Sequence, residues 1–241
     1  MKVRILASAP DGSGLDYLTT FLVNGTVAID AGCLGFFGPP AEQAKVAHVF
    51  VTHSHADHIF SLPMFAMNVS EHAGRGIVVR SHEHVIETLR TDIFNGRVWP
   101  DFLRILDRGV PLVRLETIAP GVPVNADGLS ITPVRVKHPV PTTAYLVDDG
   151  RAAVVFSPDS GPTDEIWALA GTLPHFKGVF LGVAFPDELA TRAQLAGHLT
   201  PALVPAEVAK MPPETRVIVT HIKAAHRVRV TGEVDDLRLP N

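Results

Sequence analysis

The chain has 241 residues, enough for one large domain with a sizeable core or for two small ones. Its 46% hydrophobic and 19% charged residues exclude an intrinsically disordered chain. The formal net charge of −4, without any basic tract, does not favour nucleic acid as a partner.

Apolar, β-branched runs bounded by Gly, Pro, Asp or Asn predict strands, and segments with helical periodicity lie between some of them. In chain order, strands are expected at 3–6, 21–29, 46–52, 76–80, 112–115, 130–136, 143–147, 153–156, 178–183 and 216–220, and helices at 59–69, 82–94, 163–170, 189–196 and 201–210. This order predicts an α/β fold of sheets packed on each other with helices outside. No linker or repeat is visible, so we predict a single domain over residues 1–241. The aperiodic segment 95–111, with Trp99, Pro100 and Phe102, is read as a buried plug rather than a loop over a site.

The apolar segments and the cysteine count restrict where the protein can be located and how it could bind a metal. No stretch approaches about 18 consecutive apolar residues, and the chain does not begin like a signal peptide, so we expect a cytoplasmic protein without membrane contact. The single cysteine, Cys33, excludes an intrachain disulfide and a cysteine-rich zinc site. Any metal must therefore be held by carboxylates and by some of the 12 histidines.

The strongest chemical signal is Thr-His-Ser-His-Ala-Asp-His at 52–58, after an expected strand and before an expected helix. At strand period two, His53 and His55 point the same way, whereas Asp57 and His58 fall where the chain turns. Imidazole and carboxylate ligands suit Zn²⁺, Mn²⁺ or Fe, and four of them can serve two ions. A chance run of surface or capping histidines is disfavoured, because all four residues lie within six positions.

This stretch resembles the metallo-β-lactamase superfamily, whose His-x-His-x-Asp-His motif it matches without a gap. The resemblance implies a four-layer αββα sandwich and further ligands at strand ends, and the sequence offers His138, Asp159 and His221 after three expected strands. The family pattern assigns one zinc to His53, His55 and His138, the other zinc to Asp57, His58 and His221, and the bridging position to Asp159. It also places a carboxylate behind a ligand histidine, and Asp30 fits that place; an ordinary Asp-x-Gly turn is the alternative for Asp30.

Within the superfamily, the sequence is most similar to class II cyclic-nucleotide phosphodiesterases, with the tRNA 3′-end endonucleases as their nearest relatives. The stretches that carry this similarity are Asp-Ala-Gly-Cys-Leu at 30–34, the segment 52–62, Thr-Thr-Ala-Tyr-Leu at 142–146, Gly-His-Leu-Thr-Pro at 197–201 and Thr-His-Ile-Lys at 220–223. The fourth stretch discriminates best, because a histidine near the metals that is not a ligand, here His198, suits a phosphodiester mechanism. A cap on the helix expected from Pro201 is the alternative for His198.

The resemblance implies a reaction as well as a fold. A hydroxide bridging two Zn²⁺ ions would attack a 3′,5′-cyclic nucleotide, cAMP or cGMP, and leave a 5′-monophosphate. Asp57 would orient the hydroxide and accept a proton, while His198 would stabilise the equatorial oxygens or protonate the departing 3′-oxygen. The substrate is then a small-molecule phosphodiester, Mn²⁺ or Fe could replace zinc, and the family suggests a homodimer.

Three other readings stay open. A tRNA 3′-processing endonuclease with a substrate-clamping arm would insert it between His138 and Asp159, where 21 positions (159 − 138) leave no room. A thioester or lactam hydrolase would not need His198, and a non-catalytic metal-binding domain would not need the complete ligand set.

The sequence also departs from the family pattern. Pro158, where a glycine is expected, and the missing acidic residue around 182–184 leave the exact substrate open. Six aromatic residues that could form a base-binding wall are read as core: Phe36, Phe37, Phe60, Phe65, Trp99 and Phe185.

Overall fold

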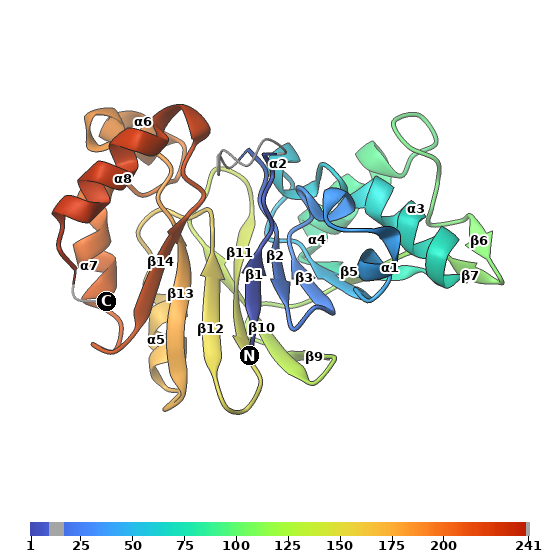
Figure 1. Ribbon diagram of the computed structural model, residues 1–241, viewed down its shortest axis with the longest axis horizontal. Helices are drawn as coiled ribbons and strands as arrows, with labels where there is room; N and C mark the ends of the chain where they lie inside the picture. Colours follow the sequence, from blue (N-terminus) through green and yellow to red (C-terminus); the bar gives the residue numbers. More distant parts are fainter. Residues whose placement is uncertain (10–16, 240–241) are drawn as a thin grey trace. The chain divides into compact units, whose positions relative to one another are not determined.

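The structure is a computed structural model that describes residues 1–9 and 17–239. The chain divides into two compact units, Met1–Ala119 (unit 1) and Pro120–Asn241 (unit 2), and each unit has a six-stranded sheet of its own (Figure 1). The predicted mixed α/β fold, with sheets flanked by helices, is confirmed in each unit. The single domain over residues 1–241 stays a prediction.

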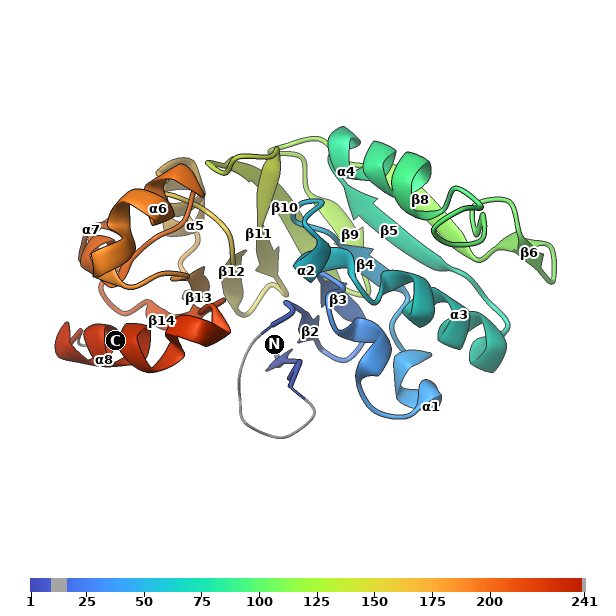
Figure 2. The ribbon, with the colours of Figure 1, turned by 90° about the horizontal axis from the view of Figure 1, so that it is seen from above.

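Unit 1 is built on a sheet with strand order β1-β2-β3-β4-β5-β8. Its strands are β1 (Val3–Ile5), β2 (Phe21–Val23), β3 (Val27–Ile29), β4 (His48–Phe50), β5 (Ile77–Ser81) and β8 (Val113–Thr117), with the separate ribbon β6 (Leu106–Asp107) and β7 (Val110–Pro111). The helical segments are η1 (Leu34–Phe36), α1 (Pro40–Gln43), α2 (Ala56–Ile59), α3 (Leu62–Ala73), α4 (Glu83–Thr88) and the π-helical turn η2 (Leu89–Ile93). Strands β1 to β3 are antiparallel and β3, β4, β5 and β8 are parallel, so the parallel strands end at one edge. Helix α1 packs against α3 (Figure 2).

Unit 2 is built on a sheet with strand order β14-β13-β12-β11-β10-β9. Its strands are β9 (Val124–Ala126), β10 (Leu129–Val136), β11 (Thr142–Asp148), β12 (Ala153–Ser157), β13 (Phe176–Gly182) and β14 (Arg216–Thr220). The helical segments are α5 (Glu165–Gly171), η3 (Asp187–Leu189), α6 (Ala190–Leu195), η4 (Pro201–Leu203), α7 (Val204–Val208), η5 (Ala224–His226) and α8 (Arg227–Asp236). Strands β9 to β12 are antiparallel, and β12, β13 and β14 are parallel. Across the described ranges 1–9 and 17–239, no helix combines the length and the apolar character needed to span a bilayer.

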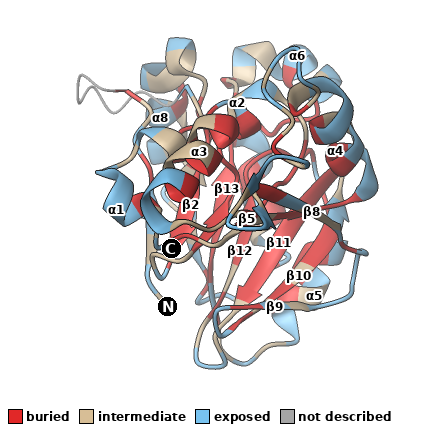
Figure 3. Ribbon diagram, turned by 90° about the vertical axis from the view of Figure 1, so that its right-hand side faces the viewer, coloured by how far each residue is buried: buried red, intermediate tan, exposed pale blue. Residues whose placement is uncertain are grey.

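Each unit has its own apolar core, made by the strands and the inner faces of the helices. Figure 3 shows buried residues concentrated along strands such as β11 and β12, whereas α1 is largely exposed. Burying β-branched residues such as Val51 and Val79 in unit 1, or Val155 and Val179 in unit 2, supplies the main favourable term for folding. The segment 95–111 contributes Phe102 to the unit 1 core, with Trp99 packed beside it, but Pro100 and most of the segment are exposed, so the plug reading holds for these two side chains and not for the whole segment.

Several predicted elements have other boundaries in the structure. The expected strand 21–29 is a hairpin, because Asn24 and Gly25 take left-handed backbone angles (φ 51° and 81°) and turn the chain. The expected helix 59–69 starts earlier as α2 and is interrupted at Phe60 and Ser61, since Pro63 cannot continue a hydrogen-bonded helix. Helix α8 is missing from the prediction, although Val230, fully buried, lies on its inner face.

Candidate metal centre

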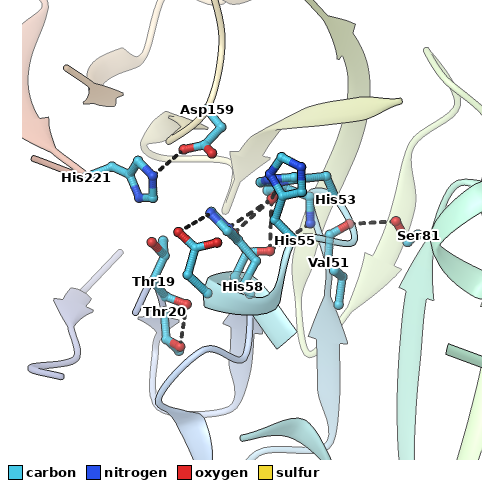
Figure 4. A network of polar contacts seen from close by, with 12 residues as sticks. Thr19, Thr20, Val51, His53, His55, His58, Ser81, Asp159 and His221 are labelled. Carbon is cyan, nitrogen blue, oxygen red and sulfur yellow. Dashed lines mark hydrogen bonds and ion pairs between the residues drawn. The ribbon is translucent and has the colours of Figure 1, made fainter. Parts of the chain in front are cut away.

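In unit 1, parallel strands β3 and β4 bring Asp30 and the 52–58 motif to the same sheet edge. Because β4 ends at Phe50, His53 and His55 lie in the loop before α2 rather than within a strand. Their rings are nevertheless adjacent, with 2.9 Å between His53 Nε2 and His55 Nδ1 (Figure 4). Helix α2 carries the other two residues, and His58 Nε2 lies 3.9 Å from Asp57 Oδ2. Unit 1 therefore gathers two pairs of candidate ligand atoms.

Asp30 fixes the orientation of this motif from behind. Its fully buried carboxylate accepts a hydrogen bond from the Thr52 backbone N–H at 2.7 Å and lies 2.7 Å from His58 Nδ1. The Thr52 hydroxyl is 2.9 Å from Asp30 Oδ2 and 3.0 Å from His53 Nδ1. With Nδ1 engaged, each imidazole presents Nε2 forward, as a metal-ligating histidine does. The sequence did not indicate this role of Thr52.

Asp30 also has an unusual backbone, with φ at 61°. Left-handed angles are uncommon for residues other than glycine, although aspartate adopts them more readily than most. His221 at the end of β14 shows the same feature, with φ at 55°. Backbone strain of this kind concentrates at functional sites, where the surrounding structure enforces it. Both residues lie at strand ends where the sequence predicted site residues.

In unit 2, Asp159 lies between two histidines that come from other strand ends. His221 Nε2 is 2.9 Å from Asp159 Oδ1, and His138 Nε2 is 3.7 Å from Asp159 Oδ2 (Figure 4 for the His221 contact). Each carboxylate oxygen thus faces a different imidazole, an arrangement that suits a carboxylate shared between two cations. Lys223, whose proximity the sequence did not reveal, has its Nζ 3.0 Å from His221 Nε2.

His198 is packed into the same cluster of unit 2. Its ring centroid lies 5.1 Å from that of His138, 5.8 Å from that of His221 and 5.6 Å from that of Phe185. Ligand atoms of Asp159, His198 and His221 all lie within 4.8 Å of one another. The N-cap residue of η4 is Thr200 and not His198, and Thr200 makes no side-chain cap hydrogen bond, so the capping alternative for His198 is wrong.

The chemistry of His198 follows from its burial. Only 6% of the residue is exposed, and Nδ1 has no hydrogen-bond partner within residues 1–9 and 17–239. Burial lowers the pKa of His198 to about 4, against the opposing influence of the Asp159 carboxylate. The imidazole is therefore neutral at pH 7, with one N–H donor and one acceptor lone pair.

Glycines set the spacing of the loops in unit 2. Gly197 has φ at 65°, and a Cβ added there would lie 2.8 Å from Pro139 Cδ and 2.9 Å from His138 Cα. Its carbonyl oxygen lies 3.1 Å from His138 Nδ1, which leaves Nε2 of His138 facing Asp159. At Gly182, an added Cβ would collide with the backbone carbonyl oxygen of Pro158. The glycine that ends β13 is thus required by the close approach of the backbone that leads to Asp159.

The donor atoms of each unit match a zinc-type ion, since neutral imidazole and carboxylate are the ligands such ions take without cysteine. Five of the six aromatic residues read as core divide into two groups, and the sixth, Phe185, is half-buried beside His198 and not part of either apolar core. Phe65 is fully buried, and Phe37 and Trp99 pack against the unit 1 core. For Phe36 and Phe60, 51% and 56% exposed, the core reading is wrong, because their rings pair with each other at the surface, 6.3 Å apart.

Comparison with known proteins assigns the chain to a family. The family model described as the beta-lactamase superfamily domain matches residues 25–222. A Yersinia pestis protein named as a probable 3′,5′-cyclic-nucleotide phosphodiesterase is 26% identical over 188 residues, which cover 70% of this chain and 52% of that relative. The chain spans about half the length of the curated relatives it matches.

Solved structures agree in fold. Unliganded yeast PDE1 has a TM-score of 0.78 at 17% identity, covering 98% of this chain and 93% of the other. The metallo-beta-lactamase fold protein YhfI from Bacillus subtilis has a TM-score of 0.71 at 16% identity, covering 97% and 91%. The chain therefore belongs to the beta-lactamase superfamily, and its mixed α/β fold is that of the metallo-β-lactamases.

Proposed function

We propose that this chain is a metal-dependent phosphodiesterase that hydrolyses 3′,5′-cyclic nucleotides, cAMP or cGMP, to 5′-monophosphates. The observation that carries the proposal is His198, buried against the rings of both His138 and His221. A hydrogen-bond donor at this place can neutralise charge on a phosphate oxygen, a need that thioesters and lactams do not share to the same degree. The curated relatives named for cyclic-nucleotide hydrolysis support the same substrate class.

The proposed metal ligands are those of the superfamily pattern, for two Zn²⁺ ions: His53, His55 and His138; Asp57, His58 and His221; and Asp159 as the bridge. The pairs of donor atoms within unit 1 and the position of Asp159 between two histidines in unit 2 support this set. When bound, the ions supply water activation and positive charge at the phosphate. Zinc as the native metal and the homodimer remain predictions from the resemblance, and the cytoplasmic location remains a prediction from the apolar pattern of the sequence.

The residues of the chain share the remaining tasks. Asp57, with its side chain partly exposed, would orient the attacking water and accept its proton. Asp30 would hold His58 in the tautomer that presents Nε2. His198, neutral at pH 7, would donate a hydrogen bond to an equatorial phosphate oxygen. Its low pKa favours this donor role over protonation of the departing 3′-oxygen, because a protonated imidazole is scarce at neutral pH.

The test is product analysis with zinc-loaded protein, 3′,5′-cAMP and 3′,5′-cGMP, beside His198→Ala of measured zinc content. We expect 5′-monophosphate from the wild type and a loss of about 10² or more in rate for the variant, with zinc content unchanged. The exposed His72→Ala serves as the matched histidine control.

Two outcomes would contradict parts of the proposal. Loss of zinc from His198→Ala would make His198 a ligand, in keeping with its nitrogen lying among the ligand atoms of Asp159 and His221. A wild-type protein with two metals but no cyclic-nucleotide turnover would refute the substrate. In that case, cleavage of a precursor tRNA would favour the endonuclease alternative.

A further inference from the structure

A pocket of about 460 Å³ opens in unit 2 beside His198. One wall is Lys137, directly before His138, and a second is the turn after β12 at Gly161 and Pro162. The remaining wall runs from α6 to η4 and contains Gly197 and His198 themselves. The volume falls in the range of small-molecule sites, about 300 to 1,000 Å³.

The composition of the lining restricts what the pocket can bind. Pro162, Ala190, Ala202 and Leu203 give it apolar surfaces suited to a flat ring. Thr191, Gln194 and Thr200 add hydroxyl and amide groups that both donate and accept hydrogen bonds. Lys137 is the only charged residue of the lining, and no carboxylate is present. This chemistry fits a neutral heterocycle with several polar atoms, attached to an anionic group.

The polar groups of the pocket are available for a ligand. Within the described part of the chain, the side chains of Lys137, Thr191 and Gln194 make no hydrogen bond or ion pair, and Thr191 and Gln194 are exposed on α6. These three polar side chains can therefore turn toward a ligand in the cavity without breaking an existing contact.

The position of the pocket connects it to the cluster of unit 2. His198 lines the pocket, and its ring also packs against the rings of His138 and His221. A molecule in the pocket can therefore contact His198, the residue whose ring also packs against these two histidines. One substrate molecule could therefore place its phosphate at His198 and its organic part in the pocket.

We infer that this pocket receives the nucleoside part of the substrate, with Gln194 and Thr191 hydrogen-bonding the base and the wall residue Lys137 attracting the anionic substrate. The inference rests on the proposed function and adds the specificity for the nucleobase. A glutamine amide carries an adjacent donor and acceptor, the pair that matches N7 and the N6 amino group of adenine. The protein is accordingly expected to prefer cAMP to cGMP.

The experiment compares two pocket variants on two phosphodiesters. Gln194→Leu removes the amide, and Ala202→Trp fills the cavity; Leu195→Ala, 79% exposed on the same helix and outside the lining, is the control. With cAMP, both pocket variants should raise KM by roughly tenfold while kcat changes much less. With bis(p-nitrophenyl) phosphate, which has no base or ribose, Gln194→Leu should behave like the control.

The outcomes separate this inference from the function on which it rests. Unchanged KM for cAMP in both variants, together with wild-type turnover of cAMP, would overturn the pocket and leave the phosphodiesterase proposal standing. Hydrolysis of bis(p-nitrophenyl) phosphate without any cyclic-nucleotide turnover would instead refute the proposed substrate. If Ala202→Trp does not fold, the KM of Gln194→Leu alone tests the pocket. This variant should fold, because the Gln194 side chain is exposed and makes no hydrogen bond in the described part of the chain. An equal KM for cAMP and cGMP in the wild type would overturn the role of Gln194.

Discussion

The two units hold their histidines by different means. In unit 1, the proposed ligands form one short stretch, and a buried carboxylate, Asp30, orients them through hydrogen bonds to Thr52 and His58. In unit 2, the proposed ligands come from separate strand ends, and glycines let the backbones approach closely enough to align them. Unit 1 thus depends on a buried carboxylate in addition to close backbone approach, since a Cβ at Gly32 would collide with the Asp57 carbonyl oxygen, whereas in unit 2 close approach is the main device. Variants that remove a polar partner should damage the first, and variants that add a methyl group should damage the second.

The largest effect is expected from metal removal, which acts on both units at once. Chelator-treated protein should lose hydrolysis entirely, because the residues alone supply no comparable activation of water. Binding of an ion at 1,000 times its Kd stabilises the native state by about 4 kcal/mol, so the melting temperature should fall as well. Activity, elemental analysis and calorimetry on the same sample, before and after adding Zn²⁺ back, provide the measurement. Full activity after complete metal loss would contradict the proposed centre.

The next effect tests the polar network of unit 1. Asp30→Ala leaves the buried Thr52 N–H and His58 Nδ1 without their acceptor, which should cost about 3 kcal/mol of unfolding free energy. The near-isosteric Asp30→Asn should retain more of this stability but weaken metal affinity by about 10- to 100-fold, since His58 loses its anionic partner. Denaturant unfolding and zinc titration distinguish the two. Wild-type zinc affinity in Asp30→Asn would show that the carboxylate does not act through His58.

The matching test of unit 2 is Gly197→Ala. Its φ of 65° and the approach of a Cβ to His138 Cα and Pro139 should cost about 2 kcal/mol and shift His138 and His198. We expect a lower kcat at full zinc loading, measured after correcting for folded fraction. Gly171→Ala is the control, because it lies in α5, has no atom within 4 Å of an added Cβ, and should be neutral or stabilising. Equal stability of the two variants would contradict the spatial role of Gly197.

The same difference explains what the sequence could predict. The 52–58 motif is contiguous, so its spacing alone indicated a metal site, and strand periodicity located most strands. The roles of Thr52 and Gly197 were not predicted, because they depend on neighbours distant in sequence. Thr52 contacts Asp30, and Gly197 contacts His138. Helix α8 escaped because only the buried Val230 and its partly buried neighbours on one face indicate it, while Val228 is 91% exposed. The exposure of Phe36 and Phe60 depended on tertiary packing, which composition does not report.

The smallest effect is expected from Thr52→Val, which tests how strongly Thr52 and Asp30 are coupled in the polar network of unit 1. The substitution keeps the shape and the backbone N–H but removes the hydroxyl that lies between Asp30 and His53, at a cost of about 1 kcal/mol. Because Thr52 and Asp30 share one network, Thr52→Val combined with Asp30→Asn should depart from additivity by at least about 0.5 kcal/mol. A double-mutant cycle in denaturant measures this coupling. Strict additivity would mean that Asp30 and Thr52 orient the two histidines independently, and that unit 1, like unit 2, relies on separate local contacts.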